Sequence, residues 1–163
     1  MDRDQRGARA MRALLAALLL AAATPAGAAD WRAYDNGLMG YSVDLPASFA
    51  IAEESDTRLV LRDGAATLEV FGLELEPLGF EEAVALAMQS SADEGFAITA
   101  QAVAPRWARW TAVDGARQLA VALVPLCGTA LAGYELKFTE ADGAALQPVI
   151  ERLTASLRRT RSC

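Results

Sequence analysis

The sequence predicts an α+β fold, an antiparallel β-sheet with helices packed on it. Two Asp-Gly pairs, at 63–64 and 114–115, each lie between two stretches of strand-forming residues, and such pairs favour tight antiparallel hairpins. Apolar residues recur at helical spacing in two other places, from Phe80 onward and between Leu146 and Leu157. No repeat or linker interrupts the pattern, so we expect residues 30–163 to form a single domain.

The first part of this domain is expected to consist of paired strands. Turn-forming residues at Asn36, Gly37 and Gly40 separate the first two strands, and Pro46 closes the second. The Asp-Gly pair at 63–64 joins the next two strands. We therefore expect strands over residues 31–34, 41–45, 58–62 and 66–75.

A helix is expected next. The apolar residues Phe80, Val84 and Met88 share one helical face, and Gly95 ends the stretch. Four further strands are then expected, over residues 98–103, 107–113, 117–124 and 129–139. The third of these is apolar on both sides, which predicts a strand inside the sheet with both faces covered.

The chain is expected to end in a second helix with one apolar stripe. That stripe consists of Leu146, Val149, Ile150, Leu153 and Leu157. Because Pro148 is best tolerated in the first turn of a helix, we expect the regular helix to begin near Gln147. A looser turn at Asp142 and Gly143 is expected to precede it.

Residues 1–29 have the pattern of a cleavable secretory signal peptide. Four arginines precede an uninterrupted run of Ala and Leu over residues 13–23, and Pro25 and small residues follow. Cleavage after Ala28 or after Ala29 fits the pattern, and Met1 or Met11 can be the start. The apolar run is about half the roughly 20 residues that span a membrane, and no Cys follows it to carry a lipid. We therefore expect a periplasmic or secreted protein with no stable membrane anchor after cleavage.

Composition excludes several classes of function. The chain carries 15 basic and 21 acidic residues; removing residues 1–29, with four Arg and two Asp, leaves 11 and 19, a net charge of −8. Such a surface repels phosphate backbones, so nucleic acid is not expected as a partner. The sequence contains no His, which excludes Ser-His-Asp and Cys-His catalysis and imidazole metal sites. No metal, cofactor or catalytic residue is expected.

The two cysteines, Cys127 and Cys163, are expected to form a disulfide, because an even number of cysteines fits an oxidising compartment. Cys127 lies at the tip of an expected hairpin. The strand 129–139 leads about 36 Å away from that tip at ~3.3 Å per residue. A helix running back recovers about 18 Å, and an extended tail adds about 16 Å. The two legs nearly match, so the terminal cysteine can reach the tip. A redox-active pair is the alternative, and the absence of a Cys-x-x-Cys spacing argues against it.

Trp107 and Arg109 form the one candidate interaction patch. Their spacing places both side chains on the same face of a strand, and Trp110 on the other face. Trp and Arg are enriched in the energetically dominant parts of protein interfaces. Packing against the sheet, with the Arg stem covering the ring, is the alternative interpretation. At least one of the two tryptophans is expected to lie in the core.

Two groups of charged residues are interpreted as ordinary surface. The acidic residues Glu53, Glu54 and Asp56, and also Glu74 and Glu76, lack the spacing of a Ca²⁺ loop and are expected to be solvated loop charges. The second group consists of Arg152, Arg158, Arg159 and Arg161. These arginines are expected to complement the dipole at the C-terminal end of the last helix.

Two segments resemble the PsbP-like family. The opening Trp31-Arg32-Ala33-Tyr34-Asp35-Asn36, then Gly40-Tyr41-Ser42-Val43-Asp44-Leu45-Pro46 and Phe49, resembles the start of these domains. The closing segment 149–158 is similar to the family's last helix, with a late Ser at Ser156. The resemblance spans nearly the whole of residues 30–163. It implies an α/β/α sandwich around an antiparallel sheet, without enzymatic activity and acting through protein contacts. It carries over no binding residue.

These observations favour an exported, non-catalytic accessory or binding domain that contacts an as yet unidentified protein in a bacterial periplasm. Two other classes remain open. One is an inhibitor or immunity-type interaction protein, and the other is a small hydrolase that uses carboxylates. A deep pocket with converging acidic residues and Arg would favour the hydrolase, and an exposed Trp on a flat surface would favour binding.

Overall fold

The computed structural model describes residues 30–163, and the expected signal peptide lies outside the described residues. Ten strands, two α-helices and one 3₁₀ turn make up this part of the chain. In chain order they are β1 (Trp31–Asn36), β2 (Tyr41–Pro46), β3 (Ala50–Glu54), β4 (Arg58–Asp63), β5 (Ala66–Glu74), α2 (Phe80–Asp93), β6 (Ala97–Ala104), β7 (Trp107–Asp114), β8 (Arg117–Pro125), β9 (Ala130–Thr139), η1 (Glu140–Asp142), α3 (Gly143–Ser156) and β10 (Arg158–Arg159). Neither α-helix of this part is long and apolar enough to cross a membrane.

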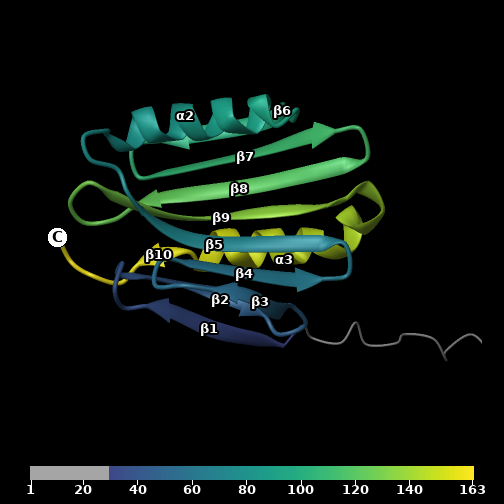
Figure 1. Ribbon diagram of the computed structural model, residues 1–163, viewed down its shortest axis with the longest axis horizontal. Helices are drawn as coiled ribbons and strands as arrows, with labels where there is room; N and C mark the ends of the chain where they lie inside the picture. The colour runs from purple at the N-terminus through teal and green to yellow at the C-terminus, as the bar shows by residue number, and fades with distance from the viewer. Residues whose placement is uncertain (1–29) are drawn as a thin grey trace, which may run out of the picture.

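The strands form two sheets. Seven strands in the order β3-β4-β5-β9-β8-β7-β6 make a large sheet, and β1, β2 and β10 make a small one. Every neighbouring pair is antiparallel. Helix α2 lies along the β6–β7 end of the large sheet, and α3 lies on the opposite face near β5 and β9 (Figure 1). The predicted α+β class with an antiparallel sheet is therefore confirmed.

The two faces of β8 enter two separate cores. Ala120 and Ala122 pack in the core that includes α3 and β2. Leu119, Val121 and Leu123 pack in the core under α2. Both faces of this strand are covered and it has a neighbour on each side, as its doubly apolar sequence predicted.

Strand β3 was expected to be loop. All five of its residues are exposed, so its sequence lacks the alternation that marks a half-buried strand. It pairs with β4 at the edge of the large sheet, with an irregular register between Ile51 and Glu53. The expectation that Glu53 and Glu54 lie in a loop was therefore wrong, although both side chains are solvated.

Helix α3 begins four residues before the expected position. It starts at Gly143, directly after η1, and Pro148 lies inside it. Proline removes one backbone donor from the helix. The helical first turn places Leu146 in the core against the sheet, and this burial offsets the loss of the Pro148 hydrogen bond.

The expectation that the C-terminal arginines complement the end of the last helix holds for Arg158, whose guanidinium donates to the Ser156 carbonyl at 3.2 Å. None of the four arginines lies within the last turn of α3 itself. Arg152 forms an ion pair with Asp44 on β2, with 2.6 Å between Nη2 and Oδ2. The helix ends at Ser156, whose hydroxyl accepts a hydrogen bond from the Asp44 amide. The chain then straightens, and β10 adds to the edge of β2.

A disulfide joins Cys127, in the β8–β9 turn, to Cys163, and the two Cα atoms are 5.3 Å apart. Before reaching it, the tail crosses the β1–β2 turn. There the Thr160 amide donates to the Gly40 carbonyl at 2.9 Å, and the Arg161 guanidinium donates to the Gly37 carbonyl. The last helix and tail thus return the C-terminus to the hairpin tip.

Replacing Gly133 with alanine should destabilise the protein. A Cβ there would lie 2.8 Å from the Ala122 carbonyl oxygen and would also overlap the Leu123 side chain. Because the backbone of β8 cannot move away without a large energetic cost, we expect a loss of about 2 kcal/mol in the free energy of unfolding, measured by urea titration. Gly143→Ala is the matched control, since the nearest atom there is 3.7 Å away. Equal stability of the two variants would contradict the close approach of β8 and β9.

Candidate functional site

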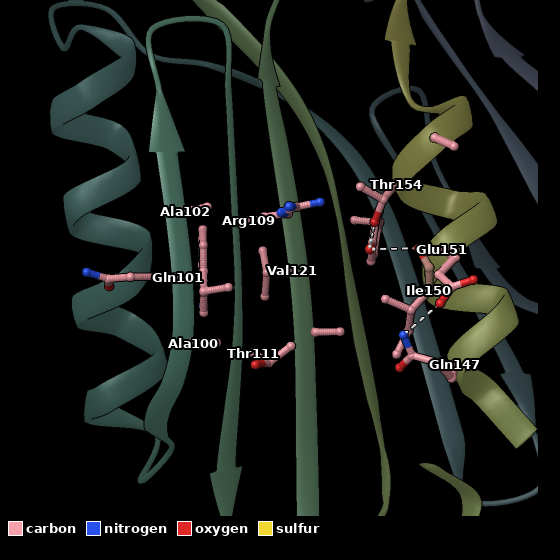
Figure 2. A pocket seen from close by; sticks show the side chains of 14 residues that line it. Ala100, Gln101, Ala102, Arg109, Thr111, Val121, Gln147, Ile150, Glu151 and Thr154 are labelled. Carbon is pink, nitrogen blue, oxygen red and sulfur yellow. Dashed lines mark hydrogen bonds between the residues drawn. The ribbon is translucent and has the colours of Figure 1, made fainter. Parts of the chain in front are cut away.

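A groove of about 540 Å³ runs between α3 and the face of the large sheet that α2 does not cover (Figure 2). Strands β6, β7, β8 and β9 form its floor, and α3 forms one wall. Its lining consists of Ala100, Gln101, Ala102, Arg109, Trp110, Thr111, Ala120, Val121, Tyr134, Gln147, Ile150, Glu151, Thr154 and Ala155.

The groove exists because α3 covers only part of this face. The helix packs over β8, β9 and β2, and β6 and β7 extend beyond it toward the edge of the sheet. Along these strands the floor is low, because Ala100, Ala102 and Ala120 have only methyl side chains. A second section of about 360 Å³, lined among others by Trp107 and Leu157, continues the groove.

Arg109 lies where the two sections meet and lines both of them. Its guanidinium carbon lies 5.2 Å from the centre of the Trp107 ring, within the range of a cation–π contact. Trp107 is 41% exposed. The pair therefore offers a flat apolar ring and a positive charge side by side at the opening of the groove.

The base of the groove carries a hydroxyl pair. Tyr134 on β9 and Thr154 on α3 lie 2.7 Å apart, oxygen to oxygen. Burial raises the pKa of the Tyr134 phenol, and the hydrogen bond to Thr154 and the charge of Arg109 oppose that rise. The phenol therefore stays protonated at neutral pH and acts as a hydrogen-bonding group.

Glu151 is the one carboxylate that lines the groove. It accepts a hydrogen bond from the Gln147 side chain at 3.0 Å. Carboxylate-based hydrolysis of the usual kind requires two such groups on either side of the bond that breaks. The groove lining therefore does not present that pair.

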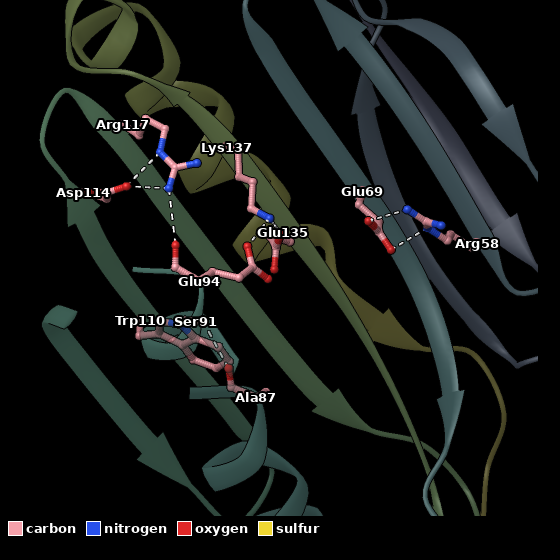
Figure 3. A network of polar contacts seen from close by, with 10 residues as sticks. All are labelled: Arg58, Glu69, Ala87, Ser91, Glu94, Trp110, Asp114, Arg117, Glu135 and Lys137. Carbon is pink, nitrogen blue, oxygen red and sulfur yellow. Dashed lines mark hydrogen bonds and ion pairs between the residues drawn. The ribbon is translucent and has the colours of Figure 1, made fainter. Parts of the chain in front are cut away.

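Three cations on the α2 side of the sheet, Lys137, Arg58 and Arg117, lie beside carboxylates (Figure 3). The Lys137 Nζ lies 2.8 Å from Glu94 Oε2 and 2.7 Å from Glu135 Oε1. The Arg58 Nε lies 2.6 Å from Glu69 Oε1. Arg117 likewise pairs with Asp114. Within residues 30–163, neither Arg106 nor Arg109 forms an ion pair with a carboxylate. Both line the groove.

Comparison with solved structures gives the same architecture. The chain superposes on cyanobacterial PsbP (CyanoP) from Synechocystis sp. PCC 6803 with a TM-score of 0.60 and 12% identity, covering 86% of this chain and 98% of that one. The fold is PsbP-like. It is also similar to the Saccharomyces cerevisiae Ran-binding protein Mog1p, with a TM-score of 0.59 and 11% identity, covering 80% of this chain and 96% of that one. No family model and no curated protein sequence matches the chain.

Within this PsbP-like fold, the structure places the predicted Trp107 and Arg109 together on one face of β7, at the groove. Trp110 points the other way, as expected for the core residue of the pair. It is 3% exposed, and its indole nitrogen donates to the Ser91 hydroxyl at 3.2 Å.

Sequence reasoning missed the wall of the groove. Gln147, Ile150, Glu151 and Thr154 recur at spacings of three and four, which places them along one side of α3. That spacing was the available signal. The acidic residues near positions 53–56 and 74–76 do not converge, and no group of three metal-ligating side chains occurs among residues 30–163.

Proposed function

We propose that this protein is an exported, non-catalytic module that binds another protein through the groove beside α3. One observation carries the proposal. Trp107 and Arg109, the residue types that dominate protein interfaces, lie exposed and stacked at the opening of a groove, and Arg109 has no carboxylate partner within residues 30–163.

Export is supported by two features from opposite ends of the chain. Residues 1–29 carry the basic segment, apolar run and small residues of a cleavable signal. The Cys127–Cys163 bond is of the kind that persists in a periplasm or outside the cell. We infer that the domain of residues 30–163 acts in solution there.

A protein partner is supported by the shape and chemistry of the groove. A long open groove with an apolar floor and a charged rim resembles the surfaces that receive a partner's backbone or side chains. A neighbour in fold, Mog1p, is a Ran-binding protein. The lining has one carboxylate, so the groove offers support for binding and none for carboxylate-pair hydrolysis.

The proposal is tested by site-specific crosslinking in cells that express the protein. A photoreactive amino acid at Thr111, in the groove, should trap a partner that mass spectrometry identifies. The same group at Arg62, an exposed position on β4, is the control. A partner trapped equally at both positions, or at neither, would contradict a binding role for the groove.

Once the partner is identified, Trp107→Ala should weaken its binding by about tenfold or more, and Arg109→Ala should do the same. Both side chains are exposed, so the variants should keep the stability of the parent protein. Isothermal titration calorimetry measures the affinity. Ile51→Ala, at an exposed apolar position on the other edge of the sheet, should bind like the parent. Unchanged affinity for the two groove variants would rule out the patch.

A further inference from the structure

We propose that the free edge of β6 receives an extended, acidic segment of a partner protein as an additional strand of the large sheet. The inference rests on the proposed function, because it names the part of the partner that the groove side of the protein recognises. It follows from the edge strand itself, from the row of alanines on it, and from the charge beside it.

The two edges of the large sheet differ in chemistry. At one edge, β3 has five residues, two of them Glu. At the other edge, β6 has eight residues, Ala-Ile-Thr-Ala-Gln-Ala-Val-Ala, with no charge and no Pro. Within the described residues, β7 is the one strand that pairs with β6. Natural proteins protect free edges with charge, Pro, a bulge or a cover. The register of β6 is irregular between Ile98 and Ala100, so the uncharged stretch 100–104 is the part suited to pairing.

The face of β6 toward the groove is a row of alanines. Ala100, Ala102 and Ala104 stand beside Thr111, Arg109 and Trp107 of β7, respectively. Adjacent strands lie about 4.8 Å apart, so an added strand would lie about 10 Å from β7. With only methyl groups between, the long side chains of β7 can reach across β6 and contact the added strand. Larger side chains in the row would block that reach.

The positive charge of Arg109 favours an acidic residue on the added strand. Arg109 projects over this face without an ion-pair partner among residues 30–163. The Arg109 side chain extends from β7 toward α3 (Figure 2), and rotation about its side-chain bonds would bring the guanidinium over Ala102, within reach of a carboxylate on the added strand. An apolar residue two positions away, opposite Ala104, would contact the exposed Trp107 ring. We therefore expect the partner segment to alternate, with an acidic and an apolar residue on its groove-facing side.

A second copy of this chain does not meet these conditions. Its own β6 carries no acidic residue, so β6-to-β6 pairing would leave both Arg109 side chains without a carboxylate. Charge complementarity at Arg109 thus points to a different chain that carries an acidic residue in its added strand.

A designed peptide tests the inference. The probe is the capped heptapeptide Thr-Val-Thr-Glu-Thr-Val-Thr, which places Val, Glu and Val on one face. Titration into the ¹⁵N-labelled protein, purified after expression of the complete chain, should shift backbone amides of β6 and β7. The version with Lys in place of Glu should bind at least about tenfold more weakly, because it opposes Arg109. A fully N-methylated version, which has no backbone donors, should not bind.

The variant Arg109→Gln should remove the preference for Glu over Lys, and Arg62→Gln should keep it. Three results would overturn the inference: no binding of the Glu peptide, equal binding of the Glu and Lys peptides, or shifts confined to β3. These results are separable from a failure of the proposed function. If a natural partner crosslinks at Thr111 but the peptide does not bind at β6, the edge inference fails and the binding function stands.

Discussion

Replacing Cys127 and Cys163 together by serine should lower the free energy of unfolding by about 4 kcal/mol. The two residues are 36 positions apart, so the bond closes a long loop in the unfolded chain and removes much of its freedom. In the folded chain the bond holds the tail, whose other contacts include the Thr160 amide on the Gly40 carbonyl. The free energy of unfolding of the whole domain should therefore fall, and the C-terminal tail should be the first segment to lose its structure.

Two measurements check this expectation. Urea unfolding of the double variant gives the free energy, and the parent protein under reducing conditions should show the same loss. Hydrogen exchange should show that the amides of β10 and Thr160 lose protection well before those of β9, which lies in the middle of the large sheet. A change in stability below about 1 kcal/mol would mean that the bond does not constrain the unfolded chain as the loop length requires.

Much of the fold could be predicted because its signals are local. The Asp-Gly turns depend on glycine at positive φ, and Gly64 and Gly115 have φ of 56° and 57°. The period of two in β7 and β9 follows from one face meeting the core and the other meeting solvent or a groove. The residues of these turns and strands are therefore sufficient to predict them.

The elements that were not predicted owe their structure to distant partners. Strand β3 buries no residue, and only its pairing with β4 makes it a strand. Strand β10 has two residues, and it exists because the tail lies against Tyr41 and Ser42 of β2. The early start of α3 likewise depends on the surface that Leu146 packs against. Long-range contacts of this kind leave no periodic pattern in the sequence.

The candidate site likewise has one part that the sequence predicts and another that depends on long-range packing. A period of two was enough to place Trp107 and Arg109 on one face and Trp110 on the other. The groove itself depends on where α3 crosses the sheet, which leaves β6 and β7 uncovered on that side. The sequence of α3 predicts a helix with a polar side, and only the packed structure shows that Thr154 and Glu151 line a groove.

Replacing Leu153 with alanine should destabilise the protein by about 3 kcal/mol. The side chain is fully buried, in the core that joins α3 to β2 and the large sheet. Truncation removes apolar contacts with both sheets and leaves a cavity. The two sheets and the helix cannot easily move together to fill it. Leu86→Ala is the matched control, because Leu86 lies on α2 and is 56% exposed, and its loss should stay within about 0.5 kcal/mol.

The same substitution links the core to the proposed binding groove. Leu153 lies next to Thr154, which lines the groove, so a loosened α3 should also weaken the heptapeptide or the natural partner. Leu153→Met separates the two causes, since it nearly preserves volume and should cost less than about 1.5 kcal/mol. Thermal unfolding and peptide titration of the three variants provide the check. If Leu153→Ala unfolds like Leu86→Ala, then α3 is not anchored by this side chain, and the groove wall must be held by its other contacts, among them the Arg152–Asp44 ion pair.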